Sequence, residues 1–314
     1  MTNNSDPYEQ TNQPNQLNAE SLNVAQLLGE GEAMFIDHNL YFGHGTDSAW
    51  DEAVSILSYV LAFPPNADRS LLTTVLTGQQ LEQIRSLFRR RVDERIPAPY
   101  ITGQAWFCGL PFMVDQRVLI PRSPIAGLIT NYFEPWLQSN PKRILDLCAG
   151  GGCIGISCAY GFDEAEVVLS DISADAIAVA NINIDNHKLG KRVVAIQSDL
   201  FEGLKGRDFD LIISNPPYVD QADLDNMPEE FRHEPELALA SGCDGLDFTR
   251  RLLQQAHEYL SEDGLLIVEV GNSGEALEGA FPSVPFMWFE FAEGDSGVFM
   301  LTQAQLAEHR EMFA

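Results

Sequence analysis

The sequence is short of basic residues. Its 314 residues hold 19 lysines and arginines against 46 aspartates and glutamates, a formal net charge of -27. Such a surface repels phosphate backbones, whose binding depends on neutralisation by Lys and Arg, and it repels anionic membranes for the same reason. We therefore expect no strong nucleic-acid binding and no membrane partner. The charge would attract a basic macromolecule, although it also fits a role in solubility alone.

The sequence also lacks paired cysteines and long apolar runs. None of its five cysteines forms a C-x-x-C pair, and no set of cysteines and histidines has the spacing of a zinc site, so we expect no metal. Their odd number indicates free thiols in a reducing compartment. There is no basic-then-apolar signal segment, and no apolar run approaches the roughly 18 residues of a membrane span. These absences predict a cytoplasmic protein.

Length and composition otherwise indicate a globular protein of two units. Hydrophobic residues make up 45% and charged residues 21% of the chain. Residues 1–20 are polar, so we expect a disordered tail there. Residues 21–96 predict a small helical domain, with apolar residues at helical spacing over Val24–Asn39, Ala49–Leu61 and Gly78–Val92.

The helical part carries one basic run and two histidines. We interpret the run as a solvent-exposed helix face, because charge runs on helices are usually exposed. His38 and His44 have no nucleophile at a readable spacing, so structural or surface roles fit them better than catalysis. The basic run consists of Arg85, Arg89, Arg90, Arg91 and Arg95.

Residues 97–122 change character and predict a β-hairpin linker. Proline and glycine punctuate aromatic and β-branched stretches, and Tyr100–Phe107 can pair with Phe112–Ile120 across a turn. Over residues 123–314 we expect one α/β domain, which begins with an amphipathic helix over Ile125–Leu137.

Strands alternate with helices after residue 143, which predicts a mostly parallel sheet with helices on both faces. The expected strands are Arg143–Leu147, Val167–Ser170, Val193–Gln197, Phe209–Ser214 and Leu265–Val270, followed by a closing pair, Trp288–Ala292 and Val298–Thr302, turned at residues 294–297. The expected helices are Ile154–Tyr160, Ser173–Asn186 and Asp247–Leu260, with Ser173 as an N-cap.

A glycine-rich loop follows the first of these strands. Gly150, Gly152 and Gly155 spell G-x-G-x-x-G between a strand and a helix, which alone fits a dinucleotide site. Asp146, four residues before the first glycine, would repel a pyrophosphate but suits a cation. S-adenosylmethionine (SAM) is such a ligand, because it has a sulfonium and an amine and no phosphate.

Two acidic residues follow the next two strands. Asp171 ends the second strand, and an acid about 20 residues after such a loop can accept from both hydroxyls of a ribose in NAD and SAM enzymes alike. Asp199 could accept a hydrogen bond from an adenine amine, with Leu200 or Phe201 against the ring.

The most specific motif is Asn215-Pro216-Pro217-Tyr218, directly after an apolar strand. The Asn215 side-chain oxygen and the Pro216 carbonyl could each accept a hydrogen bond from one N–H of an amide or amine NH2 group. That would fix a weakly nucleophilic nitrogen and leave its lone pair facing a methyl donor. Pro216 and Pro217 stiffen the loop, and Tyr218 offers a flat face to the amide or base.

Residues 234–239, Glu-Pro-Glu-Leu-Ala-Leu, predict a loop over this site. Glu234 could hold a substrate or tie the loop down. The sequence leaves these two roles open.

These motifs, in this order, resemble a class I SAM-dependent methyltransferase of the HemK/Prm family from about residue 22 to the C-terminus. The resemblance implies a Rossmann-like seven-stranded sheet, SAM as co-substrate and methylation of the side-chain amide nitrogen of a glutamine in proteins of translation. It implies that the helical domain recognises the substrate and that residues 215–218 hold the glutamine amide. The implied SAM contacts are Asp146, Gly150, Gly152, Asp171, Asp199, Leu200 and Asn215.

Two stretches distinguish branches of this family. Residues 120–126 read Ile-Pro-Arg-Ser-Pro-Ile-Ala, where the release-factor branch has Asp/Glu-Thr-Glu after Ile-Pro-Arg-Pro. Residues 37–45 read Asp-His-Asn-Leu-Tyr-Phe-Gly-His-Gly. Both are similar to the branch that modifies the basic large-subunit ribosomal protein uL3, as free protein or in an assembly intermediate.

Other functions remain open at this point. An adenine-amine nucleic-acid methyltransferase would use the same Asn-Pro-Pro-Tyr chemistry on a flipped base, but the acidic composition disfavours it. A release-factor methyltransferase, a non-catalytic ribosome-assembly factor and an NAD dehydrogenase are the further alternatives. The last does not explain residues 215–218.

Overall fold

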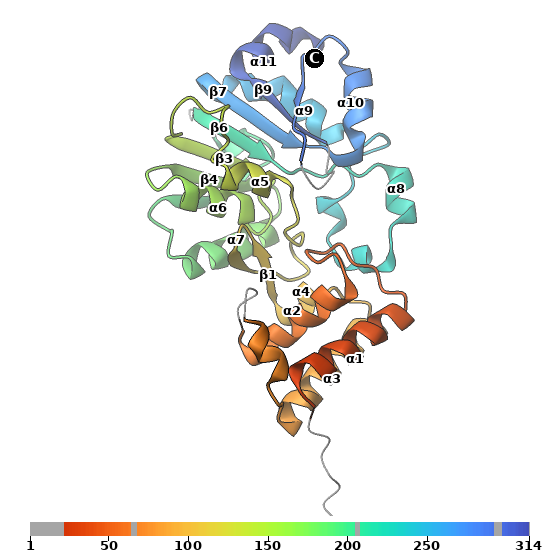
Figure 1. Ribbon diagram of the computed structural model, residues 1–314. Helices are drawn as coiled ribbons and strands as arrows, with labels where there is room; N and C mark the ends of the chain where they lie inside the picture. Colours follow the sequence, from red (N-terminus) through yellow and green to blue (C-terminus); the bar gives the residue numbers. More distant parts are fainter. Residues whose placement is uncertain (1–21, 64–67, 205–207, 292–296, 314) are drawn as a thin grey trace, which may run out of the picture.

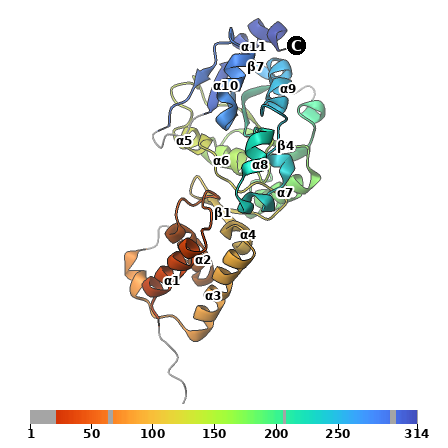
Figure 2. The same cartoon turned by 90° about the vertical axis from the view of Figure 1, so that its right-hand side faces the viewer.

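The computed structural model describes residues 22–63, 68–204, 208–291 and 297–313. A helical part and a larger α/β part lie at opposite ends of the molecule, with a small hairpin between them (Figures 1 and 2). The tail expected over residues 1–20 lies outside the described residues. Within the described ranges, every helix is too short or too polar to cross a membrane.

Three helices pack around an apolar core in the helical part. Each begins at a side-chain N-cap, Asn23, Ser48 or Thr77, which accepts a hydrogen bond from a backbone N–H of the first turn. Their apolar faces meet around the fully buried rings of Phe35 and Phe88. The helices are α1 (Val24–Asp37), α2 (Ala49–Leu61) and α3 (Gly78–Asp93), with a 3-10 turn η1 (Arg69–Thr73) before α3, and their ends agree with the prediction to within two residues.

The basic run of α3 is not a uniform solvent-exposed face, so that prediction is wrong in part. Arg89 and Arg90 are exposed, as expected. The side chain of Arg91 is 0% exposed, and its Nε lies 3.0 Å from Oε1 of Glu52 on α2. The helical periodicity places Arg91 on the buried side of α3, where a charge is tolerated only when it is paired.

The linker hairpin is shorter than predicted. It pairs β1 (Gln104–Phe107) with β2 (Leu110–Met113), and the residues before β1 form a short helix, α4 (Ala98–Thr102). Residues 114–124 continue as irregular chain beyond β2, and the Tyr100 hydroxyl donates a hydrogen bond to the Val118 carbonyl oxygen (2.5 Å). The first predicted strand therefore begins too early, and the second both begins and ends too late.

A seven-stranded sheet forms the centre of the α/β part, as predicted. Its order is β5-β4-β3-β6-β7-β9-β8; the pairs from β5 to β7 are parallel, and β9 runs antiparallel to both of its neighbours. The strands are β3 (Arg143–Leu147), β4 (Glu166–Asp171), β5 (Val193–Gln197), β6 (Phe209–Ser214), β7 (Leu260–Glu269), β8 (Met287–Trp288) and β9 (Val298–Thr302).

Alternating residues of each strand enter two separate cores. Leu211 and Ile213 of β6 face one core, whereas Ile212 faces the other, as the two-residue period of a strand requires. Helices on both faces cover these cores. The first face carries α5 (Ile125–Thr130), α6 (Cys153–Gly161) and α7 (Ala174–Asn186), and the second carries α9 (Asp247–Gln255), α10 (Gly274–Ala280) and α11 (Gln303–His309).

Several predicted boundaries are wrong. The strand expected from Leu265 begins at Leu260, as β7. The helix expected up to Leu137 ends at Thr130, because Tyr132 and Phe133 adopt positive φ values of 53° and 54°. The helix expected up to Leu260 ends at Gln255, since Leu260 already begins β7. Of the closing pair, β8 is shorter than predicted, and residues 292–296 of its turn lie outside the described residues.

Candidate functional site

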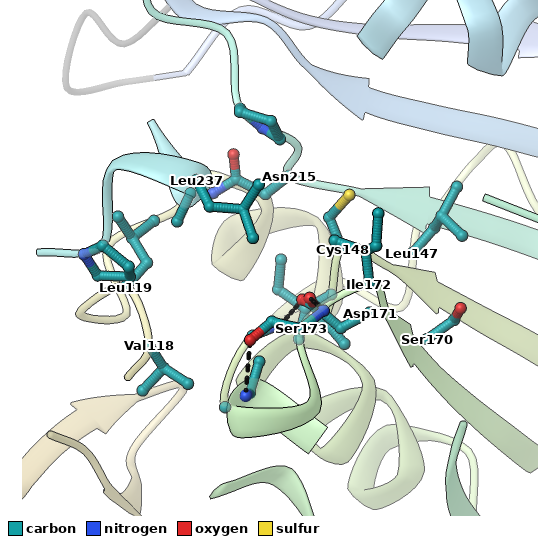
Figure 3. A pocket seen from close by; sticks show the side chains of 18 of the residues that line it. Val118, Leu119, Leu147, Cys148, Ser170, Asp171, Ile172, Ser173, Asn215 and Leu237 are labelled. Carbon is teal, nitrogen blue, oxygen red and sulfur yellow. Dashed lines mark hydrogen bonds between the residues drawn. The ribbon is translucent and has the colours of Figure 1, made fainter. Parts of the chain in front are cut away.

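A cavity opens where the carboxyl ends of β3, β4, β5 and β6 meet (Figure 3). The chain continues from β3 to β4 on one side and later returns to β6 on the other, and such a reversal of strand order is the place where open α/β sheets bind ligands. The linker over residues 117–123 and the turn over 235–238 add further walls. The cavity is therefore built from segments far apart in the sequence.

The loop after β3 presents backbone to this cavity. Gly150 lines the cavity at a φ of 51°, and a Cβ built there would meet open space. Gly152, at a φ of 81°, is the N-cap of α6, and the Leu169 side chain lies 2.6 Å from where its Cβ would stand. Gly150 thus forms part of the cavity wall, whereas Gly152 allows close packing behind it.

Asp171, at the end of β4, reaches the glycine loop. Its Oδ2 accepts a hydrogen bond from the Gly150 N–H (2.9 Å). Its Oδ1 accepts one from the N–H of Ser173 (2.9 Å), which lies beside it in Figure 3. Burial raises the pKa of Asp171. A carboxylate oxygen has two lone pairs, so Asp171 can still accept hydrogen bonds from a ligand in the cavity.

Asp199 and Leu200 line the cavity just after the end of β5. The sequence predicted both residues as cofactor contacts. The Nη2 of Arg251 on α9 lies 2.9 Å from both carboxylate oxygens of Asp199. Sequence reasoning missed Arg251, because no local pattern joins it to a residue so distant in the chain.

Asp146 lies beneath the glycine loop rather than in the cavity wall. It is 1% exposed, and its Oδ2 accepts a hydrogen bond from the Gly155 N–H (2.7 Å). Its Oδ1 has no hydrogen-bond partner in the described part of the chain. Burial raises the pKa of Asp146 to about 7, and the Asp171 charge adds to this effect. A cation in the cavity would favour the ionised form of Asp146, from the other side of the loop.

This raised pKa predicts a pH-dependent stability. Between about pH 4 and pH 7 the folded state holds the Asp146 proton more tightly than the unfolded state, so the free energy of unfolding falls as pH rises through that window. At about 1.4 kcal/mol per pH unit, the loss is at most about 4 kcal/mol. In Asp146→Asn this contribution is expected to vanish, which urea unfolding of both proteins at several pH values measures. Parallel pH profiles would contradict the prediction.

The Asn215–Tyr218 segment leaves the end of β6 and stands over the cavity. Asn215 and Pro217 line it, and Figure 3 shows the Asn215 side chain near Leu237. Among the described residues, none makes a hydrogen bond with the Asn215 side chain, whereas Pro216 is buried. The Tyr218 hydroxyl donates to Oε1 of Glu269 (2.9 Å), and burial raises the pKa of Tyr218. The structure therefore holds the tyrosine firmly and leaves the asparagine amide available.

Two residues of this arrangement were missed in the sequence. Glu269, at the end of β7, is 4% exposed and accepts hydrogen bonds from both Tyr218 and the Ser123 hydroxyl (2.5 Å). The signal for Glu269 was its place at the end of a predicted parallel strand. The signal for Ser123 was that it differs from the release-factor pattern. In the structure its hydroxyl contacts Glu269, the residue that fixes Tyr218.

Glu234 ties the loop to the linker, which decides between its two predicted roles. Its carboxylate forms a two-pronged ion pair with Arg122 (2.6 and 2.7 Å) and accepts from the Ile120 N–H (3.0 Å). Burial would raise the pKa of Glu234, but the neighbouring His44 and Arg122 outweigh this and lower it to about 2. The carboxylate is therefore charged and fully engaged in holding the cavity wall.

The histidines have structural positions. His44 is 1% exposed, with Nε2 3.6 Å from the Glu234 carboxylate, and the Nδ1 of His38 lies 2.8 Å from the Met34 carbonyl oxygen. Across the described residues, no group of three or more His, Cys, Asp or Glu side chains could hold a metal ion.

The charges at the cavity do not suit a pyrophosphate. Each of its three arginines is already paired with a carboxylate: Arg117 with Asp115, Arg122 with Glu234 and Arg251 with Asp199. A dinucleotide would need cationic groups or helix N-terminal amides free of competing carboxylates. The cavity instead favours a ligand with positive charge and hydroxyl groups.

Comparisons with known proteins agree with this chemistry. A family model described as "Methyltransferase small domain" matches residues 130–245. A protein of Francisella tularensis subsp. tularensis named "Ribosomal protein uL3 glutamine methyltransferase" is 48% identical over 88% of this chain and 88% of its own length. A protein of Neisseria gonorrhoeae with the same name is 43% identical over 93% of this chain and 98% of its own length.

The fold is shared more widely than the sequence. The catalytic domain of hMettl16, solved with the MAT2A 3'UTR hairpin 1, aligns with a TM-score of 0.51 at 14% identity, over 80% of this chain and 91% of that chain. This likeness shows a class I methyltransferase fold alone. The two relatives above confirm the resemblance found in the motifs: the chain belongs to the family of ribosomal protein uL3 glutamine methyltransferases.

Proposed function

We propose that this protein transfers a methyl group from SAM to the side-chain amide nitrogen of a glutamine in ribosomal protein uL3. The observation that carries the proposal is the Asn215 side chain, which faces a cofactor-sized cavity and has no hydrogen-bond partner among the described residues. A buried or half-buried amide left unpaired beside a cavity is a ready partner for a ligand. The names of the two relatives support the same substrate.

The cavity residues fit SAM. When bound, SAM supplies an electrophilic methyl carbon on a positively charged sulfur. Gly150 gives room for the close approach of the ligand, and Asp171 would accept from the ribose hydroxyls. Asp199 would accept from the adenine amine, with Leu200 against the ring. The ionisation of Asp146 beneath the loop would be favoured by the positive ligand.

Residues 215–218 would hold the glutamine. The Asn215 side-chain oxygen and the Pro216 carbonyl oxygen would each accept a hydrogen bond from one N–H of the amide NH2, which turns its lone pair toward the methyl carbon. The amide nitrogen forms its new bond to carbon while the carbon–sulfur bond breaks, and the electron pair of that bond stays on sulfur. The nitrogen then loses a proton to solvent, so no strong base is needed. Tyr218, fixed by Glu269, packs beside the amide.

The partner is a basic protein. A net charge of -27 favours encounter with a basic ribosomal protein, either free or in an assembly intermediate, and ribosome assembly places the reaction in the cytoplasm. The helical domain over residues 21–96 would recognise this partner, and the linker over 97–122 would connect it to the SAM-binding domain over 123–314.

Intact-mass comparison of ribosomal proteins tests the proposal. In a strain that lacks this gene, uL3 is expected to lose the mass of one methyl group, and fragmentation should place the loss on a glutamine. The purified enzyme with SAM should restore it. Loss from a release factor instead would keep the chemistry and overturn the substrate. Unchanged masses throughout would overturn the proposed function.

A further inference from the structure

One excursion of the chain links residues 215–218 to the helical domain. It begins at Val219, after the end of β6, and closes at Ser241, where the Ser241 N–H donates to the Val219 carbonyl oxygen (2.9 Å). Between these ends lie α8 (Gln221–Asn226) and two 3-10 turns, η3 (Glu229–His233) and η4 (Glu236–Ala238). In Figure 1 the segment descends from α8 toward the helical part.

Glu230, in η3, is the charged centre of this contact. Its side chain is fully buried, and its Oε1 accepts from the Tyr41 N–H (3.0 Å), lies 2.8 Å from Nη2 of Arg95 and 3.4 Å from Nη1 of Arg91. All three partners belong to the helical part. Arg91 is shared with Glu52, so the charge of Glu230 completes a buried ion cluster between the two parts.

Phe231 adds an aromatic contact at the same place. Its ring centre lies 4.4 Å from that of His44 and 5.4 Å from that of Tyr41. The guanidinium of Arg122 also lies over this ring, 5.4 Å from its centre. Because Arg122 belongs to the cavity wall, this ring touches the helical part and the cavity wall together.

The contacts continue from η3 into the cavity. Glu234, one residue beyond η3, holds Ile120 and Arg122 of the wall, and Leu237 of η4 lines the cavity itself. A continuous set of contacts thus runs from α3 through Glu230 and Glu234 to the walls of the cavity. The other end of the same excursion is the residue after Tyr218.

The contact between the helical part and the excursion contains more buried polar groups than stable packing requires. Within the described residues, Oε2 of Glu230, Oε2 of Glu52 and both ring nitrogens of His44 are buried without a hydrogen-bond partner. Burying charged and polar groups in this way costs stability that an apolar junction would not lose. What the ion cluster does provide is a defined geometry between the helical part and the excursion.

We propose that Glu230 is a positioning residue for methyl transfer, which fixes residues 215–218 and the cavity wall by attaching their excursion to the helical domain. The inference rests on the proposed function above. By this inference the helical domain contributes to the rate of methyl transfer, in addition to its proposed role in substrate recognition.

The experiment compares Glu230→Gln with Glu229→Gln in the full chain. Both changes remove one negative charge from η3, but the Glu229 side chain is 62% exposed and its nearest cation is 3.8 Å away. For Glu230→Gln we expect kcat to fall about tenfold, a smaller change in the dissociation constant of SAM, and faster hydrogen exchange in peptides covering 215–241. For Glu229→Gln we expect none of these changes. Arg95→Gln, altering a partly exposed partner of Glu230, should reproduce the effect at smaller size.

The outcomes separate this inference from the proposed function. If Glu230→Gln and Glu229→Gln have equal kcat and equal exchange over 215–241, Glu230 has no positioning role. If Glu230→Gln does not fold, Arg95→Gln decides, and wild-type kcat and exchange in that variant would overturn the inference. If the reaction itself proceeds unchanged in Asn215→Ala, the proposed mechanism fails whatever Glu230 does.

Discussion

Replacement of Asn215 by alanine is expected to lower the rate of methyl transfer by about 10²–10³-fold, the usual loss when one preorganised hydrogen-bonding group of a transition state is removed. The alanine removes the acceptor that orients the amide NH2 and stabilises the positive charge that develops on it. The side chain makes no hydrogen bond within the described residues, so its loss should leave the fold intact.

Single-turnover transfer from radiolabelled SAM to purified uL3 measures this effect, and calorimetric titration with SAM shows whether the cofactor still binds. Asn226→Ala is a matched control, because Asn226 ends α8 and, among the described residues, its side chain donates only to the backbone of the same helix (2.7 Å to the Ala222 carbonyl). Transfer at the wild-type rate in Asn215→Ala, with tight SAM binding, would remove Asn215 from the mechanism.

Replacement of Arg91 by methionine is expected to destabilise the protein by about 3–5 kcal/mol, the range for removing one partner of a buried ion pair. Methionine fills the space of the aliphatic part of Arg91, but Glu52 and Glu230 then face each other as two buried carboxylates with less compensation. Tyr41 would also lose a donor to its carbonyl oxygen.

Urea unfolding at neutral pH measures the difference in free energy. Arg90→Met is the control, because the neighbouring Arg90 is 44% exposed and its one ion-pair partner among the described residues is Glu94, the C-cap of α3. Exposed pairs of this kind contribute less than about 1 kcal/mol. Equal destabilisation by the two substitutions would show that the effect comes from the helix and not from the buried cluster.

The central sheet and the cavity at its carboxyl edge were predictable from local sequence. Each strand is a short apolar run, and Gly150, Asp171, Asp199 and Asn215 each follow such a run directly, so parallel pairing brings them together. Pro216 and Tyr218 could be placed beside these residues because they follow Asn215 directly in the sequence. Their partners could not, because a hydrogen bond such as Tyr218 to Glu269 joins residues that share no local pattern.

The same reasoning explains what failed. A run of arginines on an amphipathic helix predicts an exposed face unless buried acidic partners are known. The partners of Arg91 are Glu52 on another helix and Glu230 in another part of the molecule, and no local pattern joins them to it. Asp146 illustrates the converse case. Its position four residues before Gly150 indicated a carboxylate beside the glycine loop, but not that the loop would cover it.

The position of β9 in the sheet has a consequence for biosynthesis. β9 (Val298–Thr302) lies between β7 and β8 although it is synthesised after both, so the outer edge of β7 has no partner while the chain is growing. Leu265 to Val268 of that strand are buried on both faces in the finished protein. A chain that stops before Val298 would thus expose a long apolar edge of the kind that pairs with other chains. Premature termination is therefore expected to yield aggregates that chaperones and proteases recognise, rather than a soluble fragment that competes for SAM.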